Sequence, residues 1–135
     1  MGVPPPPGKT VRPIVADEDQ TAVASVLHLL RQDGHAVVHA CDALSATQLA
    51  SALQDVCDLL ITNTRVGAAD GVDLIRRLRG KAPTLPVLYL ANTGRSTPEM
   101  EARLPPGIPI LREPFTAEQL RAAVESLLDG GRPSP

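Results

Sequence analysis

The chain has 135 residues and a formal net charge of −2 at pH 7; 43% of its residues are hydrophobic but only 1% are aromatic. This length suits a single domain that buries its own core, which has to be built from Leu, Val, Ile and Ala. The scarcity of aromatic residues argues against a stacking platform for single-stranded nucleic acid. The lack of a strong basic excess argues against binding of a phosphate backbone.

The number of cysteines and the hydropathy of the chain indicate in which cellular compartment the protein is expected. Two cysteines, Cys41 and Cys57, are too few for a disulfide framework and favour free thiols. No apolar run reaches the roughly 20 residues of a membrane-spanning helix, and the N-terminal segment lacks the apolar centre of a secretory signal. We therefore expect a cytoplasmic protein with no membrane segment.

Proline and glycine mark both ends of the chain. Four consecutive prolines occupy positions 4–7, and the sequence ends in GGRPSP. Such segments are extended or irregular. We expect a Pro-rich flexible segment over 1–10, one domain over 11–130 and a flexible tail over 131–135, as in a domain tethered within a larger protein.

The first half of the chain alternates strand and helix patterns. An apolar run at 13–16 predicts a strand that stops at acidic residues. Apolar residues at helical spacing over 23–30 predict a helix that Asp33 and Gly34 end. The segments 36–40 and 59–62 predict two further strands, with an intervening helix over 46–53.

The alternation continues in the second half. Asp70 and Gly71 mark a turn before a helix that includes residues 72–78, and the continuous apolar run 86–90 predicts a fourth strand. Thr97 and Pro98 predict a helix start, and 108–111 predicts a fifth strand. A capping box at 116–119 opens the last helix, which Gly130 ends.

Five strands alternating with five helices predict an α/β domain with a parallel sheet and helices on both faces. Functional groups of such sheets gather beyond the carboxyl ends of the strands. Asp17 and Glu18 follow the first strand, where paired carboxylates can bind Mg²⁺. Capping of the following helix is the simpler interpretation of these acids, and Asp19 is well placed for it.

Four segments taken together point to a family. They are IVADED, DLLITNTRVGAADGVDLIRRLR, LPVLYLA and PILREPFTAEQL, in this order. With them the chain resembles the receiver domains of two-component response regulators and hybrid histidine kinases over residues 11–129. The resemblance implies the flavodoxin-like receiver fold, a doubly wound sheet with the strand order 2-1-3-4-5.

The residues that carry receiver chemistry are replaced. In the family, an Asp ending the third strand accepts the phosphoryl group, and a Lys before Pro contacts the phosphoryl oxygens. A Thr or Ser on the fourth strand and an aromatic on the fifth form the switch. Carried over to this sequence, the acceptor position is Asn63, the lysine position is Glu113, and the switch positions are Ala91 and Ile110.

These replacements predict the loss of phosphorylation. The amide of Asn63 is not a carboxylate nucleophile, Ala91 cannot donate a hydrogen bond, and Glu113 would repel a phosphoryl group. Ile110 is expected to pack in place.

The resemblance assigns the acidic pair Asp17 and Glu18 to Mg²⁺ binding. With Asn63 and the backbone of Arg65, they predict at most a weak Mg²⁺ site, and no cofactor is required. We expect Glu113 to converge on the same cluster. Arg65 or Arg112 is the alternative neighbour that folds over these acids.

The leading hypothesis is a degenerate receiver, a pseudo-receiver that is not an enzyme. It would bind a histidine kinase, an output domain or another receiver without phosphorylation, and the resemblance also allows a homodimer through the face from the fourth to the fifth helix. The alternative is an active receiver in which Asn63 is an engineered or compensated acceptor, with Asp70 as the nearest later acid.

Two further interpretations concern other residues. A flavodoxin-like electron carrier shares the layers, but DEDQ after the first strand would repel a flavin phosphate. Arg76, Arg77 and Arg79 predict a solvated helix face, with a partner surface as the alternative.

Overall fold

The computed structural model describes residues 13–16, 20–40, 42–52, 59–66 and 69–128. The flanks expected at 1–10 and 131–135 lie outside these residues. The elements in chain order are β1 (Pro13–Ala16), α1 (Gln20–Gln32), β2 (Val38–Ala40), α2 (Ala43–Ala52), β3 (Leu59–Asn63), β4 (Arg65–Val66), β5 (Ala69–Asp70), α3 (Gly71–Lys81), β6 (Val87–Ala91), α4 (Pro98–Ala102), β7 (Ile110–Arg112) and α5 (Ala117–Leu128).

A five-stranded parallel sheet in the order β2-β1-β3-β6-β7 forms the centre of the domain. The fold class and the strand order expected from the sequence are therefore confirmed. A two-stranded antiparallel sheet, β4-β5, lies between β3 and α3 and was not expected. Each of its strands has only two residues, too short to leave a pattern in the sequence.

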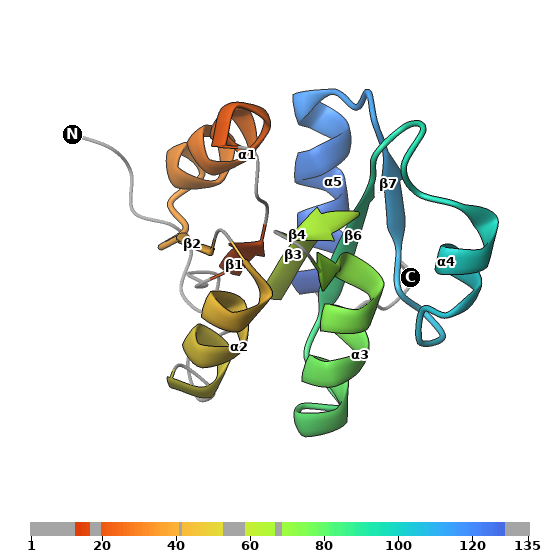
Figure 1. Ribbon diagram of the computed structural model, residues 1–135. Coiled ribbons are helices and arrows are strands. Elements are labelled where there is room, and N and C mark those ends of the chain that lie inside the picture. Colours follow the sequence, from red (N-terminus) through yellow and green to blue (C-terminus); the bar gives the residue numbers. More distant parts are fainter. Residues whose placement is uncertain (1–12, 17–19, 41, 53–58, 67–68, 129–135) are drawn as a thin grey trace, which may run out of the picture.

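Helices cover both faces of the sheet (Figure 1). One core layer lies between the sheet and α2, α3 and α4; the other lies between the sheet and α1 and α5. Successive residues of β3 and β6 enter opposite layers, and all ten residues of these strands are buried. Two-sided burial explains why these segments read as unbroken apolar runs.

Local sequence signals mark the end of α1 and the starts of α4 and α5, as expected. Gly34 has a φ of 90°, and the N–H of His35 donates to the carbonyl of Leu30, a pattern that closes the last turn of α1. Thr97 caps α4 with Pro98 at its start. At α5, Thr116 and Gln119 exchange both hydrogen bonds of the capping box.

The fifth strand is displaced from its expected position. β7 covers Ile110–Arg112, whereas the apolar pattern predicted 108–111. Ile108 is buried before the strand begins, but Ile110 is 36% exposed, so the expectation that Ile110 packs in place is wrong. β7 pairs only with β6, and an edge strand leaves part of its surface to solvent.

Among the described helices, none combines the length and the apolar character that a membrane span requires.

Gly71 places the start of α3 against the end of β3. A Cβ placed on Gly71 would lie 2.0 Å from the carbonyl oxygen of Asn63, while the N–H of Gly71 donates to the carbonyl of Thr64. Only glycine leaves room for this contact. The start of α3 is thereby held against the end of β3.

Gly71→Ala is expected to lower the free energy of unfolding by at least about 2 kcal/mol, because backbone has to shift to accommodate the methyl group. Gly80→Ala is the control in the same helix. Apart from its chain neighbours and the nearby backbone of α3, no atom lies within 4 Å of a Cβ at Gly80, so that change should stabilise the protein by up to about 1 kcal/mol. Urea denaturation measures both, and equal effects would contradict the packing at Gly71.

Candidate functional site at the carboxyl edge of the sheet

Asn63 ends β3 at the carboxyl edge of the sheet. Its side chain is 6% exposed, and its Oδ1 accepts a 2.7 Å hydrogen bond from the N–H of Thr64. Its backbone oxygen faces Gly71 and accepts a hydrogen bond from the hydroxyl of Thr62. The residue expected at the acceptor position is therefore a neutral amide, held by contacts with its own turn.

Ala91 and Glu113 lie side by side at the ends of β6 and β7. The N–H of Glu113 donates to the carbonyl of Ala91, and Ala91 is buried with no hydroxyl to offer. The Glu113–Pro114 peptide bond is cis, and the hydroxyl of Thr93 donates to the carbonyl of Glu113 at 2.6 Å. The structure thus brings the backbones of two replaced positions together.

Thr64 supplies a buried hydroxyl at this edge. Its Oγ1 donates to the carbonyl of Leu90 and accepts from the N–H of Asn92 at 2.8 Å. These bonds join the turn after β3 to the turn after β6. The hydroxyl of Tyr89 lies 3.4 Å away, at the limit of hydrogen bonding.

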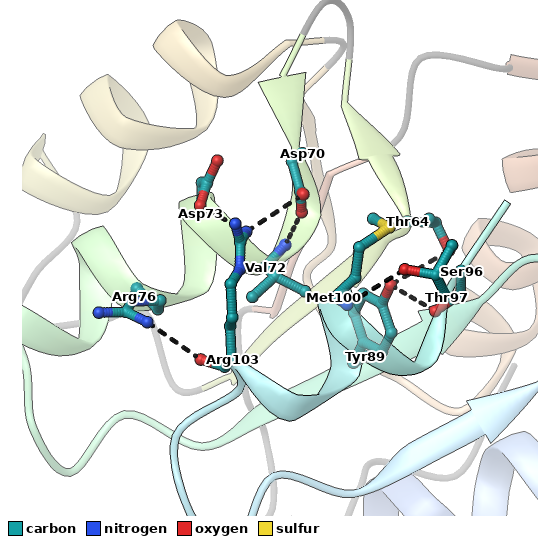
Figure 2. Close-up of polar contacts among 10 residues, drawn as sticks. All are labelled: Thr64, Asp70, Val72, Asp73, Arg76, Tyr89, Ser96, Thr97, Met100 and Arg103. Carbon is teal, nitrogen blue, oxygen red and sulfur yellow. Dashed lines mark hydrogen bonds and ion pairs between the residues drawn. The ribbon is translucent and has the colours of Figure 1, made fainter.

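A chain of polar contacts leads from Tyr89 to β7. The Tyr89 hydroxyl lies 2.8 Å from Oγ of Ser96, which donates to Oε2 of Glu101 at 2.7 Å. Because Ser96 gives its one proton to the carboxylate, Tyr89 donates to Ser96. Figure 2 shows Thr64, Tyr89 and Ser96 converging beside the start of α4.

Glu101 closes this chain with a two-pronged ion pair. Arg112, the last residue of β7, places its two terminal nitrogens 2.9 and 2.5 Å from the two carboxylate oxygens of Glu101. The hydrogen bond from Arg112, with help from Ser96, holds the pKa of Glu101 below its ordinary value of 4.5. The same pair raises the pKa of Arg112. A bidentate arginine–carboxylate pair fixes orientation as well as charge, so α4 is tied to β7.

The alternative considered above places Arg65 or Arg112 over the acids after the first strand, which lie outside the described residues. Arg112 pairs with Glu101. Arg65 is exposed on β4 and lines a cavity of about 470 Å³ together with Asp70, Arg95 and Met100. The sequence did not reveal the Tyr89 network; its only signal was a tyrosine inside an aliphatic strand.

Asp70, considered above as a substitute acceptor, has another structural role. Its Oδ1 accepts from the N–H of Val72 at the start of α3, and its Oδ2 lies 3.2 Å from Arg103. Arg103 also pairs with Asp73 at 2.7 Å (Figure 2). Asp70 therefore caps α3 and links it to the end of α4.

The described residues do not make a cation site on their own. Within the described ranges, no three His, Cys, Asp or Glu side chains gather closely enough to hold a metal ion. Asn63 offers an amide oxygen that already accepts a hydrogen bond. Asp17 and Glu18, the expected Mg²⁺ ligands, lie outside the described residues, so that expectation stays a prediction.

A doubly wound parallel sheet in the order β2-β1-β3-β6-β7 defines the flavodoxin-like fold. A model of the response regulator receiver domain family matches residues 14–125. The response regulator MprA of Mycobacterium tuberculosis is 32% identical over 126 residues, 92% of this chain and 53% of MprA. The chain belongs to the response regulator receiver domain family.

Other similar proteins agree with this family. MprA of Mycobacterium leprae is 30% identical over 125 residues, and the chain spans about half the length of the curated relatives it matches. A receiver protein of Sinorhizobium medicae superposes with a TM-score of 0.79 at 24% identity over 90% of this chain and 96% of that one. A receiver domain protein of Clostridium thermocellum superposes with a TM-score of 0.76 at 22% identity, over 88% of this chain and 94% of that one. These structures support the fold.

The hydrogen bond between Tyr89 and Ser96 should couple the two residues energetically. Tyr89→Phe and Ser96→Ala are each expected to lower the free energy of unfolding by about 1 kcal/mol. The double variant should lose about 0.5 kcal/mol less than the sum, because the two changes remove one shared bond. Thr93→Val, whose hydroxyl contacts Glu113 instead, is the control and should add to Tyr89→Phe without coupling. Additive effects of Tyr89 and Ser96 would contradict the network.

The lowered pKa of Glu101 predicts a pH dependence of stability. The folded state holds the Glu101 proton less tightly than the unfolded state, so the ion pair stabilises the protein fully above about pH 5. That contribution is lost as the pH falls through the folded pKa. Urea unfolding of the wild type and Glu101→Gln should differ most at pH 7, and the difference should shrink as the pH falls below the ordinary pKa of 4.5. Glu99→Gln, an exposed change in the same helix, controls for lost charge; a wild-type advantage over Glu101→Gln undiminished at pH 3 would contradict this assignment.

Proposed function

We propose that this receiver domain acts in two-component signalling as a docking module that does not use phosphorylation. The observation that carries the proposal is the neutral, buried amide of Asn63 at the end of β3. An amide nitrogen has no lone pair available for attack on phosphorus, and its oxygen lacks the charge of a carboxylate. The proposal treats the domain as a binding partner and not as an enzyme.

The neighbouring groups support the same proposal. Phosphoryl transfer depends on fixed positive charge against the phosphoryl oxygens. The residue before the cis proline is Glu113, an anion where the family has a lysine. Ala91 offers no hydroxyl to a phosphoryl oxygen.

The packing of α4 favours one fixed binding surface. The switch of ordinary receivers uses a hydroxyl and an aromatic that move together, whereas here the corresponding residues are Ala91 and the partly exposed Ile110. The aromatic at this edge is Tyr89 on β6, hydrogen-bonded toward Ser96. With α4 also tied to β7 through Glu101, the surface made by these elements is formed without a covalent signal.

The remaining elements of the proposal concern partners and ions. A histidine kinase, an output domain or another receiver is the expected partner, and a homodimer through the face from α4 to α5 is the alternative assembly. Nucleic acid and membrane are not expected partners. Weak Mg²⁺ binding by Asp17 and Glu18 and a cytoplasmic location stay predictions.

Acetyl phosphate labelling followed by intact-mass measurement tests the proposal. The wild type should stay unlabelled, and Asn63→Asp should label poorly, because it adds a carboxylate beside Glu113 without a cation. The added repulsion should lower the free energy of unfolding by about 1 kcal/mol. Adding Glu113→Lys should restore both stability and some Mg²⁺-dependent labelling.

Asn92→Asp combined with Glu113→Lys is the matched control, since it adds a carboxylate at the same edge but not at position 63. Labelling of the wild type, for instance on Asp70, would establish the alternative of an active receiver. Equal labelling of Asn63→Asp with and without Glu113→Lys would show that Glu113 does not face the acceptor position.

A further inference from the structure

A groove rich in arginine lies between α3 and the chain that leaves α4. It has a volume of about 660 Å³. The charged residues of its lining are Arg76 and Arg79 on α3 and Arg103 after α4. α3 begins beside Asn63 and runs away from the carboxyl edge of the sheet (Figure 1), so Arg79 and Gly80 lie toward its far end, whereas Arg103 also contacts Asp70 at its start.

Two of these arginines are held in place by the fold. Nε of Arg79 donates to the carbonyl of Leu85 at 2.7 Å, which leaves its outer nitrogens for a ligand. Nη1 of Arg76 lies 3.4 Å from the carbonyl of Arg103, and Figure 2 shows these two residues side by side. Guanidinium groups that are already oriented lose less conformational entropy on binding an anion.

The described acids pair with only part of the positive charge of this face. Arg103 pairs with Asp70 and Asp73, but within the described ranges no carboxylate pairs with Arg76 or Arg79. Arg77 and Lys81 add two more cations on the same helix. Cations in a last helical turn offset the helix dipole, yet Arg76 lies in the middle of α3, where that effect has faded.

The apolar part of the groove lining decides what kind of anion fits. It includes Pro83, Leu104 and Pro105, and the lining holds no aromatic side chain on which a base could stack. A lining that combines aliphatic side chains with guanidinium groups suits a peptide in which carboxylates alternate with apolar side chains. Arginine binds carboxylates in a two-pronged geometry.

We propose that the groove between α3 and α4 binds an acidic, partly apolar peptide segment of a protein partner. This rests on the proposed function, which it deepens by naming the surface and the chemistry of the partner. Arg76 and Arg79 would bind two carboxylates, and an apolar side chain between them would contact Pro83 and Leu104. Binding would depend on salt and be independent of the phosphorylation chemistry at Asn63.

Fluorescence anisotropy with a labelled peptide of about eight residues, acidic residues alternating with leucine, tests the inference against the full chain. Arg76→Gln with Arg79→Gln is expected to weaken binding about tenfold. Arg77→Gln with Lys81→Gln removes the same charge from the same helix outside the groove lining and should change binding less than about twofold. Circular dichroism of both double variants confirms that each is folded.

Leu104→Ser is a third variant, which should weaken the leucine-containing peptide but not an all-acidic one with glycine in place of leucine. Equal losses for the two arginine-containing double variants would mean diffuse attraction and overturn the groove. Tighter binding of a single-stranded oligonucleotide of similar length, competed by the peptide, would assign the face to nucleic acid and overturn the inference.

The two proposals fail separately. Absence of peptide binding in a protein that acetyl phosphate leaves unlabelled would overturn the groove alone. Labelling of the wild type by acetyl phosphate would overturn the proposed function, whatever the peptide does.

Discussion

The burial of β3 and β6 on both faces is the constraint on which the rest of the structure depends. Their side chains alternate between two aliphatic layers, one under α2, α3 and α4 and the other under α1 and α5. A polar side chain within these strands needs a hydrogen-bond partner inside the domain, since water is excluded from both layers. Polar chemistry is therefore confined to the strand ends, with Tyr89 as an exception that reaches outward to Ser96.

The carboxyl edge of the sheet has the fold of the receiver family, and the proposed function rests on Asn63, Ala91 and Glu113 at this edge. The close approach of Gly71 to Asn63 holds α3 against β3, and the hydrogen bond from Glu113 to Ala91 joins the ends of β7 and β6. Hydrogen bonds of Thr64 join the turn after β3 to the turn after β6, and Tyr89 bonds to Ser96 in the segment that follows β6. These hydrogen bonds, together with the ion pair between Glu101 and Arg112, stabilise this edge of the sheet.

Charge is distributed unevenly over the domain. Arg76, Arg77, Arg79 and Lys81 gather on α3, although the formal net charge of the chain is only −2. Because exposed charges act over about 10 Å at moderate salt, each region presents its own potential to a partner. The basic groove beside α3 can therefore attract an acidic segment even though the whole chain is weakly acidic.

The alternation of strands and helices and the caps at Thr97 and Thr116 could be predicted from the sequence alone. Each of these is a local signal, carried by a few neighbouring residues or by spacing along the chain. The order of the strands required a family resemblance, because no local pattern says which strands pair. The position of β7 and the exposure of Ile110 were mispredicted, since burial at a sheet edge depends on what packs against it.

The ion-pair partners of the polar side chains could be identified only from the tertiary structure. Glu101 and Arg112 are on separate elements, as are Asp70 and Arg103, and nothing in their spacing announces a pair. The groove has the same origin: Arg76 and Arg79 read as a solvated helix face until the chain after α4 is placed against them. Long-range contacts depend on how elements dock, and docking is set by the packing of the whole core rather than by any one segment.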